Sequence, residues 1–109
     1  MTHNYEAQRR ETFQTFEQAA KDKIKLPKES VVEFLFLVEE VDANWPGAEK
    51  ALKAKGFHTK RDSENDLLIA SFGPIPITPE AIWAQERIAT EIAISFDFYP
   101  DGWDLGTDD

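Results

Sequence analysis

The segment at residues 30–41 constrains the fold of this chain more than any other. It is rich in β-branched and aromatic residues, which predicts a β-strand. Side chains alternate between the two faces of a strand. One face carries Val32, Phe34, Phe36 and Val38. The other carries Val31, Leu35 and Leu37. Both faces therefore need cover at the middle of the strand, and the carboxylates of Glu33 and Glu39 indicate that cover on the second face is partial.

A helix is predicted before this strand, over about residues 5–23. Its apolar residues recur at steps of three and four, which gives one apolar stripe: Phe13, Phe16, Ala20 and Ile24. Acidic residues lie early and lysines late, as the helix dipole favours. Pro27 ends the helix.

A second helix is predicted after the strand. Asp42 or Asn44 can cap it, Pro46 suits its first turn, and Gly56 is a natural stop. Residues 57–61 and 67–72 then read as two strands joined by an acidic hairpin loop at 62–66. The two prolines within residues 73–77 lack the N–H donors that a central strand needs, so we expect the second of these strands to end there.

The last helix and strand are predicted by local signals. Thr78 caps the helix and Pro79 occupies its first turn. Its apolar face is wide, with Ile82, Ala89, Ala93 and Phe96 in one row and Ile88 and Ile92 in the next. A short strand follows at 97–100, where Pro100 indicates an edge strand or its end, and residues 101–103 form a turn.

Without the first helix, the order of elements is β-α-β-β-α-β. Short connections and right-handed crossovers favour one arrangement, an α+β ferredoxin-like split β-α-β sandwich. This fold has a four-stranded antiparallel sheet with two helices on one face, here with an extra N-terminal helix. The opposite face of the sheet is open. We expect the first helix to cover it, with a dimer partner as the alternative.

The length of 109 residues allows one core. We expect residues 1–28 to form an N-terminal helix and connector, and residues 29–109 the ferredoxin-like domain. The chain has no cysteine, which excludes disulfides and thiolate metal sites. Neither a secretory signal nor an apolar run of membrane-spanning length is present in the sequence. A cytoplasmic protein with no membrane partner is expected.

Charge is distributed unevenly along the chain. The formal net charge is −9, and residues 62–109 hold one basic residue, Arg87, against 11 carboxylates. Residues 1–61 are close to neutral, with 11 basic and 10 acidic side chains. The acidic half would repel nucleic acid and attract a basic protein surface. An acidic surface that only maintains solubility is the alternative. We therefore expect no direct nucleic-acid binding.

No pattern in the sequence indicates catalysis. The two histidines, His3 and His58, have no motif that supplies a partner and a cleft, although His58 could meet Asp66 across the hairpin. The nucleophile elbow and the glycine-rich phosphate loops are absent from the sequence. The aspartates at 97–109 lack the spacing of a calcium loop. We expect no catalytic residue, no metal and no cofactor.

Two segments resemble a known family, the regulator of ribonuclease activity B proteins, which inhibit ribonuclease E. The first is Ala-Glu-Lys-Ala-Leu-Lys-Ala-Lys-Gly-Phe at 48–57. The second runs from Ile-Trp-Ala-Gln at 82–85 through Tyr99 to Asp-Gly-Trp at 101–103, where Pro100 interrupts the family's contiguous Tyr-Asp-Gly-Trp ending. The resemblance covers about residues 31–106.

The resemblance implies a non-catalytic protein that binds the basic C-terminal region of ribonuclease E and damps RNA degradation. The acidic half of this chain would complement such a region. The candidate contact residues are Glu86, Asp97, Asp101, Trp103 and Asp104. The alternative is a small ferredoxin-like dimeric module, structural or ligand-binding, with no ribonuclease partner. The chain is expected to be a monomer or a homodimer.

Overall fold

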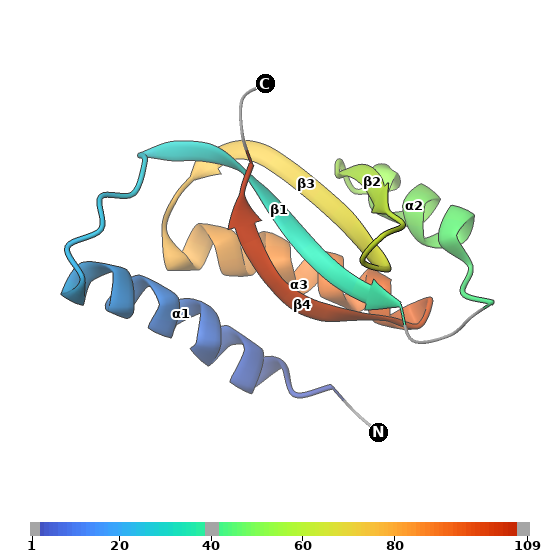
Figure 1. Cartoon of the computed structure of the whole chain (residues 1–109), viewed down its shortest axis with the longest axis horizontal. Helices are drawn as coiled ribbons and strands as arrows, with labels where there is room; N and C mark the ends of the chain where they lie inside the picture. Colours follow the sequence, from blue (N-terminus) through green and yellow to red (C-terminus); the bar gives the residue numbers. More distant parts are fainter. Residues whose placement is uncertain (1–2, 39–41, 107–109) are drawn as a thin grey trace.

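The structure is a computed structural model that describes residues 3–38 and 42–106. Along these residues the elements are α1 (Tyr5–Lys21), β1 (Glu29–Val38), α2 (Trp45–Ala54), β2 (His58–Asp62), β3 (Leu67–Pro76), α3 (Pro79–Ser95) and β4 (Phe98–Leu105). The four strands form one sheet in the order β2-β3-β1-β4, and every neighbouring pair is antiparallel. Figure 1 shows α2 and α3 behind this sheet. The predicted α+β ferredoxin-like sandwich is confirmed.

The core lies between the sheet and the helices α2 and α3. β1 supplies its centre, because Val32, Phe34 and Phe36 are at most 1% exposed. These are three of the residues predicted to share one face. The other members are Ala48, Leu52, Phe57, Leu68, Ala70, Ile77, Ile82, Ala89, Ala93 and Phe98.

The predicted caps fix the ends of α2 and α3. The side chain of Asn44 accepts a hydrogen bond from the backbone N–H of Gly47 at 3.0 Å, and Thr78 accepts one from Ala81 at 3.2 Å. Such caps satisfy N–H groups that have no partner within the helix. Gly56 follows α2 with a φ of 93°, a conformation that glycine adopts without strain.

β3 continues past Gly73, so the prediction that its prolines end the strand was wrong. Pro76 pairs with Glu29 and Ile75 with Ser30. β2 ends its pairing with β3 at Ser71, so this part of β3 has only β1 as a neighbour. The N–H of Ile77 points at β1 and donates to Lys28 O at 3.0 Å. By alternation the nitrogen of Pro76 points away from β1, where no donor is needed, and Pro74 lies in a bulge opposite Val31, where the regular ladder is interrupted.

β4 also extends beyond its predicted end, from Phe98 to Leu105. Phe34 pairs with Trp103 but Phe36 pairs with Pro100, so two residues of β4 lie opposite the single residue Leu35. The predicted turn at 101–103 is therefore a β-bulge inside an edge strand. Gly102 lies in this bulge with a φ of 104°.

Helix α1 lies beside α3 along the β4 edge of the sheet (Figure 1). Phe16 of α1 stacks on Trp103, with ring centroids 5.8 Å apart. Because Trp103 pairs with the core residue Phe34, its side chain is on the same side of the sheet as the helices. The expectation that the first helix covers the opposite face was therefore wrong: α1 widens the helical layer instead.

Candidate partner-binding surface

The sheet face opposite α2 and α3, here called the open face, has an apolar centre. Leu37 lies between Leu67 and Tyr99, and Leu35 lies opposite Ile69. Leu37 is 38% exposed and the other four side chains are partly exposed. Within residues 3–38 and 42–106, the helices lie on the far side of the sheet or along its β4 edge. The second apolar face that the sequence indicated is thus uncovered in this single chain.

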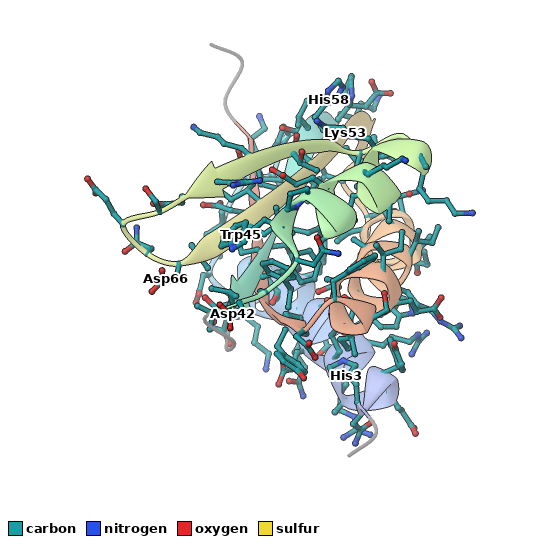
Figure 2. The ribbon with its side chains drawn as sticks, turned by 90° about the vertical axis from the view of Figure 1, so that its right-hand side faces the viewer. His3, Asp42, Trp45, Lys53, His58 and Asp66 are labelled. Atoms are coloured by element: carbon teal, nitrogen blue, oxygen red, sulfur yellow. The ribbon has the colours of Figure 1, made fainter. Side chains whose placement is uncertain are left out.

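Four aspartates border this apolar centre and are here called the acidic rim: Asp62, Asp66 and Asp97 lie near the end of β1, and Asp101 lies opposite Leu35 in the β4 bulge. Asp62 is the β2 partner of Leu67. Asp66 O accepts a hydrogen bond from the N–H of Val38 at 3.1 Å, while Asp97 directly precedes Phe98, the β4 partner of Val38. Asp66 and Asp97 therefore flank the end of β1 on its two sides. Figure 2 shows Asp66 at the hairpin turn, on the side of the ribbon away from α3.

The structure separates the five candidate contact residues into two groups. Asp97, Asp101 and Asp104 are exposed and lie along β4 or directly before it. Asp104 pairs with Glu33 at the other end of the strand, on the open face. Glu86 is only 4% exposed, and the half-buried Trp103 faces the helical side. A partner on the open face therefore reaches the aspartates but not Glu86.

Glu86 lies in a polar contact between α1 and α3. Thr12 donates its hydroxyl proton to Glu86 Oε1 at 2.5 Å, and Gln8 Nε2 donates to Glu86 Oε2 at 3.3 Å. Gln8 Nε2 also donates to Thr90 Oγ1 at 2.9 Å, and His3 Nε2 lies 2.6 Å from Gln8 Oε1. Every polar side chain on α1 that faces α3 in this contact has a partner.

Burial raises the pKa of Glu86 above its ordinary value of 4.5. The hydrogen bonds from Thr12 and Gln8 act in the opposite direction, and the charge of Glu11 raises the pKa further. Removal from water destabilises the charged form of a carboxyl group unless hydrogen-bond donors surround it. Two side-chain donors therefore keep this group in place between the helices.

A groove of about 290 Å³ runs beside this contact, between α1 and β4. The groove is lined by Glu11, Thr15, Pro100 and Trp103, and also by Glu86 from the polar contact between α1 and α3. Trp103, which stacks on Phe16, supplies part of the apolar wall of this groove. The groove is built on the helical side and does not reach the open face.

A comparison with protein families gives one match. The sequence profile described as "Regulator of ribonuclease activity B" matches residues 9–105. The chain belongs to this family. The matched region begins inside α1 and ends with β4, so it includes the α1–α3 contact of Thr12 with Glu86. No curated protein matched the chain in a separate search.

The family match assigns the chain to a class of regulatory proteins. The one catalytic arrangement that the sequence allowed, His58 beside Asp66, does not form in the structure. His58 pairs with Ser71 at the start of β2, whereas Asp66 lies in the turn at the far end of the hairpin. Figure 2 shows the two labels at opposite ends of this hairpin. The pairing of His58 with Asp66 that the sequence allowed is therefore wrong.

One of the basic side chains near the β2–β3 hairpin, Arg61, contacts residues of α2. Arg61 makes two hydrogen bonds to Glu49, at 2.7 and 3.1 Å, and lies over the ring of Trp45. These contacts hold α2 on β2, on the helical side of the sheet. Lys60, the β2 partner of Ile69, is the one lysine among the strand residues that face the open side in the described register.

Two structural findings bear on the expected absences. Among the described residues, no group of three or more His, Cys, Asp or Glu side chains is placed to hold a metal ion. In the same residues, none of the helices has the length and apolar character needed to cross a membrane.

Proposed function

We propose that this protein is a non-catalytic regulator that binds ribonuclease E outside its catalytic region and lowers its activity on RNA. The observation that carries the proposal is the family match over residues 9–105. The charge of the chain supports it, because 11 carboxylates and one arginine occupy residues 62–109. A partner that degrades RNA carries basic RNA-binding segments, and an acidic protein surface complements them.

The exposed aspartates of β4 and the turn before it are the proposed contacts. Asp97, Asp101 and Asp104 have no ion pair within the described residues, so their charges are available to a partner. Complementary charge raises the association rate and is screened by salt over about 8–10 Å at physiological ionic strength. We place the protein in the cytoplasm, with the RNA that its partner degrades.

The test uses purified ribonuclease E and a labelled RNA substrate. Cleavage is measured with and without this protein at about 0.05 M and about 0.5 M salt, where the Debye length differs about threefold. We expect slower cleavage and direct binding at low salt, with both effects reduced at high salt. Full cleavage and no binding at low salt would reject the proposed partner.

A second candidate is a dimeric module without a ribonuclease partner, and the uncovered open face is the observation that favours it. Light scattering separates the two candidates. A dimer that neither binds ribonuclease E nor slows RNA cleavage would support this second function.

A further inference from the structure

We infer that the open face is the docking surface, and that its occupant is a short amphipathic helix of the partner with basic flanks. Apolar side chains of that helix pack on Leu37, Leu67 and Tyr99, while its lysines or arginines reach the acidic rim. This inference rests on the proposed function, because it takes ribonuclease E as the protein that carries the helix.

The apolar centre of the open face is suited to a partner because its side chains form a continuous row. Leu67, Leu37 and Tyr99 occupy one rung across three neighbouring strands. Leu35 and Ile69 form part of the next rung. Covering such side chains releases about 25 cal/mol per Å² of apolar surface removed from water, so this row is the main source of affinity on the face.

The three strands that carry this row are together about as wide as one helix that runs parallel to them. Neighbouring strands lie about 4.8 Å apart, so three strands span about 10 Å, which is the diameter of an α-helix with its side chains. Asp62 lies on the β2 side of the row, and Asp97 and Asp101 lie on the β4 side. A helix laid parallel to β1, over the middle of the row, thus has carboxylates on both flanks.

The charge of the face selects a basic occupant and disfavours a second copy of this chain. Beyond the four rim aspartates, Glu33 and Asp104 face the same side, and Lys60 is the one opposing lysine. Two copies packed by their open faces would bring mainly carboxylates together, which is unfavourable. A helix with lysine or arginine flanks gains from the same arrangement.

The backbone holds two of the rim aspartates in defined positions. Asp66 and Asp97 have φ values of 53° and 66°, in the left-handed region that Asp and Asn tolerate better than most residues. Both positions are therefore set by the turns that flank β1. Replacing either residue with asparagine removes a charge and preserves this backbone conformation, which provides a clean test.

The first test replaces Leu37, at the centre of the row, with glutamine. Ile88 on α3 is a matched control, because it is also 38% exposed and lies on the helical side. The affinity of each variant for purified ribonuclease E is measured by biolayer interferometry. We expect the Kd of Leu37→Gln to rise about fivefold, because a partner can bury only the part of this leucine that is exposed in the free protein, a little over a third of it. The Kd of Ile88→Gln should stay within about twofold of wild type, because Ile88 lies outside the proposed interface.

The second test removes charge from the rim. The double variant Asp66→Asn with Asp97→Asn is compared with Glu17→Gln with Glu80→Gln, which loses the same charge from exposed positions on the helical side. At about 0.05 M salt we expect the rim variant to bind about fivefold more weakly, with the difference largely gone at about 0.5 M. The control should bind less than about twofold more weakly.

The outcomes separate this inference from the proposed function. If wild-type protein does not bind ribonuclease E at low salt, the proposed function fails and this inference with it. If wild type binds but Leu37→Gln and the rim variant, both folded by circular dichroism, bind equally well, the partner docks elsewhere and only this inference is overturned. A wild-type dimer that Leu37→Gln converts to a monomer would also overturn it, because a second copy would then occupy the face.

Discussion

Replacing Thr12 with valine tests how α1 is held on α3. The substitution keeps the shape of the side chain and removes the hydroxyl that donates to Glu86 at 2.5 Å. Both residues are nearly excluded from solvent, at 2% and 4% exposure. The carboxylate of Glu86 then keeps only the longer hydrogen bond from Gln8, at 3.3 Å.

The size of the effect follows from the charge of the acceptor. A hydrogen bond to a charged group contributes about 1.5–3 kcal/mol, so we expect Thr12→Val to lower the free energy of unfolding by about 2 kcal/mol at neutral pH. For a domain of this length, that loss lowers Tm by about 9 °C. When Glu86 is protonated, the lost bond is between neutral groups and the loss falls to about 1 kcal/mol.

The assay is urea and thermal unfolding, followed by circular dichroism, at about pH 7 and about pH 4. Thr12→Ser is the control: it keeps the donor, so any loss from its missing methyl group should be the same at both pH values. An equal loss of stability for Thr12→Val at the two pH values, or no loss at neutral pH, would refute the role given to the hydroxyl. Combining Thr12→Val with Glu86→Gln should then cost less than the sum of the two single changes.

Three further predictions concern the same helical layer. The folded-state pKa of Glu86 is raised above 4.5, so its stabilising contribution is full below the unfolded-state pKa and is lost as pH rises through the raised value. Glu86→Gln should therefore gain stability relative to wild type between about pH 4 and about pH 7, as urea unfolding at each pH will show. Phe16→Ala removes the ring that stacks on Trp103 and should lower the free energy of unfolding by about 2 kcal/mol. Tryptophan emission should shift to the red as Trp103 becomes more exposed, and unchanged emission would contradict the stacking. Asn44→Ala removes the cap that accepts from Gly47 N–H and should cost about 1 kcal/mol in thermal unfolding, whereas Asn44→Asp should cost little.

The sequence was sufficient to predict most of the fold because its signals are local. Val32, Phe34 and Phe36 share one face of the predicted strand by alternation, and they are the buried face of β1. Asn44 and Thr78 cap the helices that the sequence assigned to them. The end of β3 was misjudged because a rule for central strands was applied to a segment that has a neighbour on one side only. The end of β4 was misjudged because residues 101–103 were predicted to form a turn, whereas they belong to a β-bulge.

The position of α1 could not be predicted from its apolar stripe. Ile24, assigned to that stripe, is 57% exposed, whereas Gln8 and Thr12 are buried. Apolar periodicity cannot detect a helix whose buried face is polar, because the matching polar groups lie 74–82 residues away on α3. Because the prediction placed the first helix over the open face, it did not identify Leu37 as an exposed residue.

The candidate contact residues were predicted from charge and from the closing Asp-Gly-Trp segment alone. This selected Asp97 and Asp101 on the rim, but it also selected Glu86, which α1 buries. Asp62 and Asp66 were recognised only as part of a hairpin loop. Their place beside Leu67 depends on the pairing of β2 with β3 and of Asp66 with Val38, which no sequence pattern expresses.

The polar contact between α1 and α3 also fixes where α1 sits along its neighbour. Gln8 meets Thr90 and Thr12 meets Glu86, so the two helices run antiparallel with partners one turn apart. A slip of one turn, about 5.4 Å, would bring Phe16 towards the carboxylate of Glu86 and leave a charge against a phenyl ring. A wholly apolar seam would tolerate such sliding, whereas this one admits a single alignment and thereby keeps the ring of Phe16 on Trp103.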